Sequence, residues 1–338
     1  RPVCLCVPNG VPLYLSRIGA EARVILKRMP GSGPFHHSDC PASYVQDVPS
    51  EDDRVRLSPA FRLNLAEAAR GAPRIVAPPG TSTIAPGAGK TPLTGLLAFL
   101  WESGEVSCWY PGMRGKRSYA VVRRCLLGAA ARARLGDIPL EELLYMPAAF
   151  SEELPWANYE ELEGQVKRSA AAGNLTVVVG ELKVSRVFGR DAVLTLRHLP
   201  QARFRVKAKD IGGMTPVDFV SAKEHRLAIA MTVARAAQEF VVHEVGWLRL
   251  GPQWLPARTQ EQHQLVHELV ESARYFQVQP GASFAVRLLD VAGGALDVRI
   301  GSMPAGYKIG AERVWWWDPR KPALPLPPGA QRARGQAA

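Results

Sequence analysis

Two clusters of cysteine and histidine near the start of the chain restrict its fold more than any other feature. Cys4 and Cys6 form a Cys-x-Cys pair, and a second cluster follows with His36, His37 and Cys40. Three thiolates and one imidazole are a donor set typical of a tetrahedral structural zinc site. The spacing therefore predicts that the three cysteines bind Zn²⁺ together with either His36 or His37. The alternative is that these are unrelated cysteines and a histidine in a turn.

The segment between the two clusters has the pattern of a β-hairpin. Val11, Leu13 and Leu15 alternate with polar or small residues, residues 18–21 can form a turn, and residues 24–26 are a second apolar run. A hairpin brings ligand pairs that are distant in sequence close together. A segment this short cannot bury a core of its own, so a bound metal would supply folding free energy. We therefore expect residues 1–45 to form a zinc-ribbon-like module.

Composition and charge indicate what class of protein this is and which partners it can bind. The chain has 338 residues, of which 47% are hydrophobic and 22% charged, as in ordinary globular domains. No apolar run approaches the ~18 residues that a membrane span needs. Few cysteines and no visible signal peptide predict a cytoplasmic protein without a membrane partner. The formal net charge of +11 predicts attraction to polyanions.

Changes in residue pattern along the chain predict an α+β fold with several regions. The zinc-ribbon-like hairpin comes first, a central helical segment follows, and a mixed β-sheet with helices forms the C-terminal part. The expected regions are an extended segment and Pro/Gly-rich linker at 46–91, a helical region at 92–173, an α+β region at 174–318 and a Pro-rich disordered tail at 319–338.

The linker ends in a sequence, residues 87–91, that superficially resembles a phosphate-binding loop. Ile84 occupies the position at which that loop has its first glycine, and a proline-rich segment leads in where a buried strand is needed. We therefore expect no nucleotide partner. Thr91 instead predicts a helix N-cap, with Pro92 in the first turn of the helix.

A basic helix is the first candidate nucleic-acid contact. Residues 106–136 contain seven Lys or Arg residues, no acid and several aromatic residues, and a helix is expected from about 116 to 135. Such a helix can hold phosphates and stack bases. Its candidate contacts are Lys116, Arg117, Arg123 and Arg124. The acid-rich segment at 137–163 leaves an alternative open, in which the two segments pair with each other inside the fold.

A basic strand is the second candidate. Arg203, Arg205, Lys207 and Lys209 alternate with apolar or small residues. In a strand they would share one face at intervals of about 6.6–6.8 Å, which is comparable to the spacing of phosphates along a nucleic-acid strand. We therefore expect this face to contact nucleic acid.

Two acidic motifs raise the alternative of a nuclease-like enzyme. Glu181 and Lys183 form a Glu-x-Lys pattern, which a solvent-facing strand end explains equally well. Asp290 and Asp297, next to two expected short strands, weakly match the metal-binding core of restriction endonucleases. The alternative function is thus an active or degenerate nuclease with a divalent-metal site near Asp290 and Asp297.

Several stretches together resemble an uncharacterised bacterial family. They are residues 4–6, 27–40, 91–101, 109–118, 121–124 and 180–183. The family is a domain of unknown function that is often carried on plasmids and integrative conjugative elements. The resemblance implies His36 rather than His37 as the metal ligand, and implies no established activity. By association, the mobile-element setting favours DNA as the polyanion.

We therefore expect a non-catalytic, zinc-stabilised nucleic-acid-binding protein, with DNA as the ligand. Besides the nuclease, a protein–protein adaptor in conjugation or plasmid maintenance is an alternative. In an adaptor the charged segments would be satisfied within the fold.

Overall fold

The computed structural model describes residues 2–8, 10–18, 23–28, 36–37, 40, 55–59, 61, 63–66, 90–211, 226–279, 285–289, 296–301 and 314–320. Helices and strands are mixed along them, which confirms the α+β class. The described residues up to 40 belong to one compact unit and those from 55 onward to a second. No helix among these residues has the length and apolar character that crossing a membrane requires.

The N-terminal unit contains a small antiparallel sheet. Its strands are β1 (Val3–Cys4), β2 (Val11–Ile18) and β3 (Arg23–Arg28), in the order β1-β2-β3. Val11 and Leu13 are buried, as their alternation with polar residues predicts. The turn expected between β2 and β3 lies mostly outside the described residues, which end at 18 and resume at 23.

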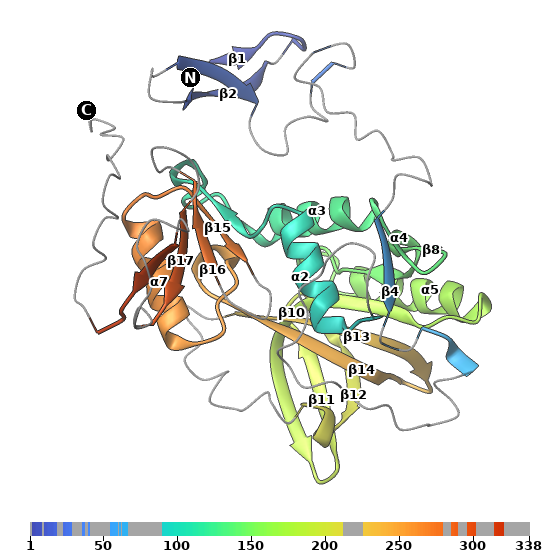
Figure 1. Cartoon of the computed structure of the whole chain (residues 1–338). Helices are drawn as coiled ribbons and strands as arrows, with labels where there is room; N and C mark the ends of the chain where they lie inside the picture. The colour runs from blue at the N-terminus through green and yellow to red at the C-terminus, as the bar shows by residue number, and fades with distance from the viewer. Residues whose placement is uncertain are drawn as a thin grey trace. The chain divides into compact units, whose positions relative to one another are not determined.

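Five strands of the second unit close into a barrel (Figure 1). The pairing runs β10-β11-β12-β14-β13 and returns to β10, because the long β10 pairs with β13 through its first half and with β11 through its second half. The contact between β12 and β14 is parallel, and the others are antiparallel. The strands are β10 (Thr176–Phe188), β11 (Asp191–Leu196), β12 (Leu199–Lys207), β13 (Arg226–Ala236) and β14 (Glu239–Leu250).

β10 is a single strand of 13 residues whose pairing partner changes near its middle. Its register with β11 shifts between Leu182 and Val184, an irregularity of the kind that bends a strand and increases its twist. Gly180 lies just before the shift, where a Cβ would come within 2.9 Å of the Leu196 side chain. The missing side chain therefore lets β11 close over β10.

The barrel interior is one of two hydrophobic cores. It includes Leu194, Phe204, Met231 and Phe240, all fully buried. The rings of Phe204 and Phe240 stack with centroids 5.5 Å apart, which links β12 to β14. Helix α5 (Ala157–Ala171) adds Leu162 and Val166 to this core.

The second core lies between helices and the outer surface of β10, β13 and β14. The helices are α2 (Leu93–Ser103), α3 (Tyr119–Ala130) and α4 (Leu140–Leu143). They pack on Val177, Val179, Ala228, Ala230 and Leu248. The first halves of β10 and β13 are consequently buried on both faces, which explains their nearly continuous apolar sequence. Residues on both sides of the boundary expected at 173 share this core.

Two helix boundaries differ from the sequence expectations. The N-cap of α2 is Pro92 rather than Thr91, and no side chain caps it. The helix expected over 116–135 is shorter: Ser118 caps α3 by accepting a hydrogen bond from the Val121 backbone N–H, and α3 ends at Ala130. Residues 133–135 then form a strand, β7.

Smaller elements complete the second unit. A five-stranded sheet has the order β18-β17-β16-β15-β6, and a four-stranded sheet has the order β5-β4-β7-β8. Thr259 and Gln262 form a capping box on α7. The bounds are β4 (Val55–Pro59), β5 (Lys90–Thr91), β6 (Cys108–Trp109), η3 (Pro111–Met113), β7 (Ala133–Leu135), β8 (Ile138–Pro139), β9 (Leu144–Tyr145), η4 (Ala208–Ile211), η5 (Pro252–Trp254), α7 (Gln260–Glu271), β15 (Phe276–Gln279), β16 (Ala285–Leu288), β17 (Leu296–Ile300) and β18 (Val314–Trp317).

Gly246 of β14 provides a test of how α2 packs on the barrel. A Cβ at this position would lie 2.5 Å from the backbone nitrogen of Thr94, so backbone would have to move. We expect Gly246→Ala to lower the free energy of unfolding by about 1–3 kcal/mol, as overpacking does. Urea denaturation measures this change.

Gly164→Ala in α5 is the matched control. Its new methyl group would meet only the flexible end of Arg168, at 3.4 Å. Alanine also favours the helix by about 0.5–1 kcal/mol relative to glycine. A Gly246→Ala variant as stable as the parent would show that α2 does not sit directly on β14.

Candidate metal centre and basic barrel face

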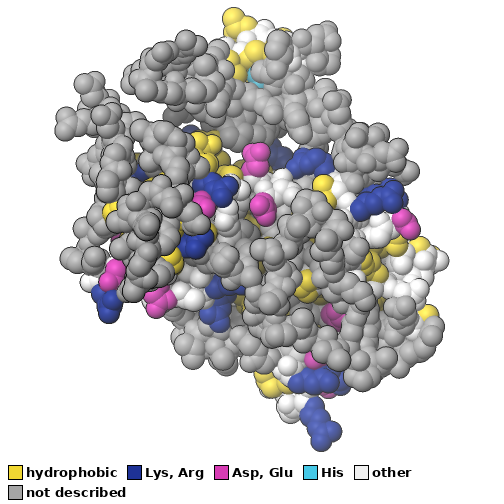
Figure 2. Space-filling model, in the orientation of Figure 1, with side chains coloured by type: hydrophobic (Ala, Val, Ile, Leu, Met, Phe, Trp, Pro, Cys, Tyr) yellow, Lys and Arg dark blue, Asp and Glu magenta, His cyan; other side chains and the backbone are white. Residues whose placement is uncertain are grey.

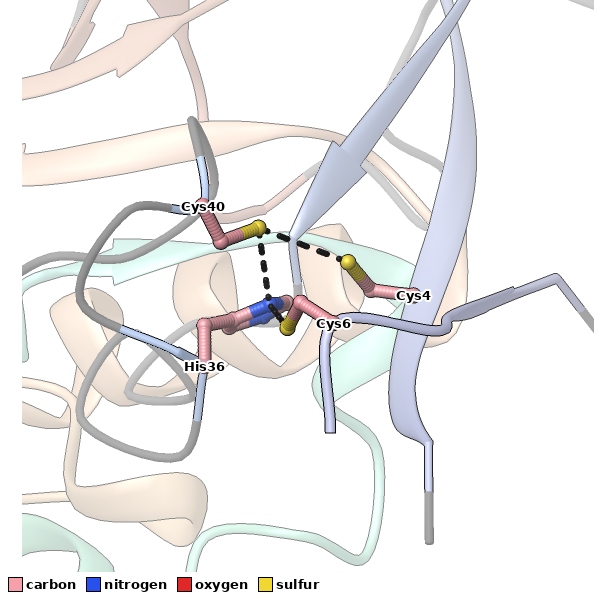
Figure 3. Close-up of side chains that lie close together, drawn as sticks. All are labelled: Cys4, Cys6, His36 and Cys40. Atoms are coloured by element: carbon pink, nitrogen blue, oxygen red, sulfur yellow. Dashed lines mark hydrogen bonds between the residues drawn. The ribbon is translucent and has the colours of Figure 1, made fainter. Parts of the chain in front are cut away.

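Four side chains of the N-terminal unit converge into one ligand group (Figure 3). The ligand atoms of Cys4, Cys6, His36 and Cys40 all lie within 4.8 Å of one another. Cys4 Sγ is 3.5 Å from Cys40 Sγ, and His36 Nδ1 is 3.3 Å from Cys6 Sγ and 3.7 Å from Cys40 Sγ. Cys4 ends β1 and Cys6 follows it, so a single short strand positions both. The arrangement is a candidate metal site.

The geometry distinguishes the two histidines that the spacing alone left open. The His36 side chain is buried and belongs to the ligand group, whereas His37 is exposed. His37 contributes its backbone N–H, which donates to Cys6 Sγ at 3.4 Å. Such a donor outside the ligand set orients a ligand and reduces its charge. Cys4, Cys6 and Cys40 form no disulfide with one another.

The basic helix region exposes fewer of its cations to solvent than the sequence suggested. Arg117 is largely buried, and its guanidinium donates to the carbonyl oxygens of Val106 at 2.7 Å, of Gln253 at 2.9 Å and of Cys108. Burial lowers its pKa to about 10. Arg117 therefore ties the α2–α3 connection to η5, because its guanidinium donors are used within the fold. Its contact with phosphate stays a prediction.

The other three candidates of this region lie nearer the surface. Arg123 is half-buried, and its Nε donates to the carbonyl oxygen of Met146 at 2.9 Å. Lys116 and Arg124 are exposed. Of the four candidate contacts in the basic helix region, these two are therefore the ones accessible to a phosphate.

Strand β12 presents its cations outward from the barrel wall. Arg203, Arg205 and Lys207 are exposed and alternate with buried residues of the interior core. Lys209 falls in η4, so the expectation that it continues the strand is wrong: β12 ends at Lys207. Arg205 Nε lies 3.6 Å from Glu239, and Lys207 Nζ lies 2.8 Å from Asp191. Arg203 has no acidic partner among the described residues.

The second half of β10 extends this basic face. The register aligns Arg186 with Val193 and Val193 with Arg205, and it aligns Phe188 with Asp191. Arg186 is exposed, and Phe188 is 63% exposed. Neither side chain is among the candidate contacts that the sequence predicts. The signal available in the sequence was Arg186 and Phe188 two residues apart before the Gly189-Arg190 turn.

Glu181 is buried, although the sequence suggested an exposed position for it. It is 3% exposed in the middle of β10, so the interpretation as a solvent-facing strand end is wrong. Its Oε1 accepts hydrogen bonds from Arg197 Nε and Arg226 Nη1, each at 2.8 Å. The Arg226 guanidinium also lies over the Trp254 ring, 4.7 Å from its centroid. The carboxylate is thus neutralised by two cations.

His198 completes this buried polar cluster. The Phe150 backbone N–H donates to its Nδ1 at 3.3 Å, so in the neutral ring the proton is on Nε2. Nε2 lies 4.0 Å from Glu181 Oε2, and the ring stacks on Tyr119 with centroids 3.7 Å apart. Burial, and then the charges of Arg197 and Arg226, lower the pKa of His198 to about 4.

The carboxylates of the nuclease alternative do not form a metal cluster in the described part of the chain. Asp297 accepts hydrogen bonds from Arg287 Nε at 2.8 Å and Nη2 at 3.4 Å. Asp290 lies outside the described residues. Among the residues that the structure describes, Cys4, Cys6, His36 and Cys40 are the one His, Cys, Asp or Glu group with metal-binding spacing.

A protein-family profile matches most of the chain. Residues 1–280 match the profile of a family described as protein of unknown function (DUF1173). The chain belongs to the DUF1173 family. None of the curated proteins compared with the chain matches it significantly. The DUF1173 match spans the candidate metal site and all five barrel strands, and it ends before β16.

The depressed pKa of His198 gives a pH dependence of stability with a defined sign. The group's ordinary value is 6.5 and its folded value is about 4, so between these pH values the unfolded chain binds more protons. The free energy of unfolding should therefore decrease as pH falls through this window. We expect His198→Asn to reduce that decrease, measured by urea denaturation across the window.

His267→Asn, a change at an exposed position of α7, is the matched control. Asparagine at 198 retains an acceptor for the Phe150 N–H, so the fold should persist. An identical pH dependence in the parent and in His198→Asn would contradict the buried, neutral state of this ring.

Proposed function

We propose that the protein is a non-catalytic nucleic-acid-binding protein, with DNA as the expected ligand, whose N-terminal unit is held by a structural zinc ion. The observation that carries the binding role is the row of outward cations on β12. A closed barrel fixes these cations at regular intervals on a rigid wall. Separate observations support the metal and the cations.

Zinc suits the ligand group in chemistry and in size. Tetrahedral bonds of about 2.3 Å to sulfur and 2.0–2.1 Å to nitrogen place neighbouring ligand atoms roughly 3.5–3.8 Å apart. The separations of 3.3, 3.5 and 3.7 Å between ligand atoms are close to this range. Four protein ligands leave no position for water, so the role is structural. The β2–β3 pairing between the ligand clusters favours the zinc-ribbon-like arrangement.

Phosphate binding suits the outer face of β12. Alternate residues of a strand are about 6.6–6.8 Å apart, so Arg203, Arg205 and Lys207 match successive phosphates. The ion pairs that Arg205 and Lys207 make are solvent-exposed. Such pairs contribute about 0–1 kcal/mol, so exchanging a carboxylate for a phosphate costs little. The face is therefore available to a polyanion.

The alternatives gain less support from the geometry. A nuclease near Asp290 and Asp297 would need Asp297 available to a metal, but Arg287 pairs with both of its oxygens. An adaptor would satisfy its charges internally, as Arg117 does, but Arg186 and Arg203 have no such partner among the described residues. The mobile-element setting stays a prediction.

We expect the purified protein to contain about one equivalent of zinc. Cys6→Ser and His36→Ala should lose it, because each removes one of the four ligands. His37→Ala is the matched control: it keeps the backbone N–H that donates to Cys6 and should retain the metal. Elemental analysis of the three variants decides the assignment. Full zinc content in Cys6→Ser would show that the metal binds elsewhere.

We expect Arg203→Ala combined with Arg205→Ala to weaken DNA binding without changing sequence preference, because phosphate contacts carry no sequence information. Each phosphate contact contributes about 0.9 to the slope of log K against log salt on duplex DNA, so the slope should flatten by about 1–2. Fluorescence anisotropy over a salt series measures both quantities.

Lys116→Ala combined with Arg124→Ala is the control at the other candidate surface. It removes the same charge from the α3 region and should leave the slope nearly unchanged. If only this control flattens the slope, the helix rather than β12 is the binding surface. If neither pair changes it, the proposed DNA-binding role is wrong.

A further inference from the structure

We infer that the barrel binds single-stranded nucleic acid, with an unpaired base stacked on Phe188 and the phosphates on the cations of β12 and β10. The inference rests on the proposed function and names its ligand class. It is carried by three observations: the connectivity of the barrel, the side chains that share its outer face, and the exposure of the β10–β11 hairpin tip.

The barrel has the strand connectivity of the oligonucleotide/oligosaccharide-binding (OB) fold. Its first strand pairs with the second and the fourth, and its third and fifth strands, β12 and β14, pair in parallel. OB barrels bind oligonucleotides across the second and third strands and at the loops after the first and fourth. Here these are β11 and β12, the Gly189-Arg190 turn and the turn before Glu239. Shared connectivity does not by itself imply a shared function. Whether this face binds nucleic acid therefore depends on its side chains.

The register places side chains on that face in rows. The first row is Phe188, Asp191 and Lys207, and the second is Arg186, Val193 and Arg205. Val184 pairs with Thr195, and Arg203 lies one alternate position before Arg205. The face therefore combines four cations with exposed apolar groups. A nucleic-acid strand needs this combination, because its phosphates seek cations and its bases seek apolar surfaces.

The hairpin tip leaves large apolar side chains in water. Phe188 is 63% exposed, Val187 58% and Val184 36%. Gly189, at a φ of 62°, allows the tight turn that directs the two strands back on each other. Figure 2 shows hydrophobic side chains beside Lys and Arg where this hairpin projects at the bottom of the view. An exposed aromatic ring on a face that also carries cations is typical of a stacking position.

Stacking on Phe188 selects single strands over duplexes. In a duplex the base faces are covered by their neighbours, so a protein ring reaches one only after a base leaves the stack, which costs a few kcal/mol. A single strand offers its base faces without that cost. The cations alone would bind either form. The difference in affinity between single-stranded and duplex nucleic acid therefore measures the contribution of stacking on Phe188.

The test measures the affinity of a labelled oligothymidine of about 15 nucleotides, a length within the 4–16 that one OB barrel covers, and of a duplex of equal length. We expect the single strand to bind more tightly. Phe188→Ala should weaken its binding about 5- to 150-fold, the usual range for one stacked base. The salt slope should not change, because no charge is lost. Phe188→Trp should keep the affinity.

Phe150→Ala is the matched control, since Phe150 is also an exposed phenylalanine and lies outside the barrel strands. If Phe188→Ala binds like Phe150→Ala while Arg203→Ala with Arg205→Ala still flattens the slope, stacking is overturned and the proposed function stands. A duplex bound as tightly as the single strand would also overturn the inference. No effect of either set of variants would overturn both.

Discussion

The pairing of β10 with two different strands is the constraint on which the barrel depends. Its first half pairs with β13 as far as Glu181, and its second half pairs with β11 from Leu182 onward. Glu181 sits at this branch and binds Arg197, which follows β11, and Arg226, which begins β13. The buried carboxylate thus connects the three strands where they diverge. Because Glu181 is 3% exposed, removing the two arginines would leave a buried carboxylate without a cation, which is costly.

Closure of the barrel determines which positive charges face solvent. On β12 the interior core fixes Phe204 and Val206 inward, so the intervening cations must point outward. Near α3, by contrast, Arg117 and Arg123 donate to the backbone carbonyl oxygens of Gln253 and Met146. Both segments are basic in sequence. The difference is that a strand in a barrel wall separates its two faces, whereas a loop-rich segment uses its long side chains as internal donors.

Patterns that depend on local geometry were predictable from the sequence. The ligand group follows from cysteine and histidine spacing, and the outward cations follow from period-two alternation. The closure of the barrel was not predictable, because it requires pairing between strands far apart in sequence. Glu181 was therefore taken for a strand end, and the use of Arg117 as a buried donor to Gln253 could not be foreseen. Both observations have the same cause, which is that distant segments decide whether a polar residue is buried.

The two units also differ in the buried apolar side chains that the structure describes. In the second unit, two large cores share the walls of one barrel. In the N-terminal unit, Val11 and Leu13 are the buried apolar side chains among the residues whose burial the structure describes. Two such side chains contribute about 3–6 kcal/mol, whereas a structural zinc site provides about 10–16 kcal/mol of apparent binding free energy. Under the proposed function, zinc would therefore contribute more than these two side chains, and removing it should destabilise the unit.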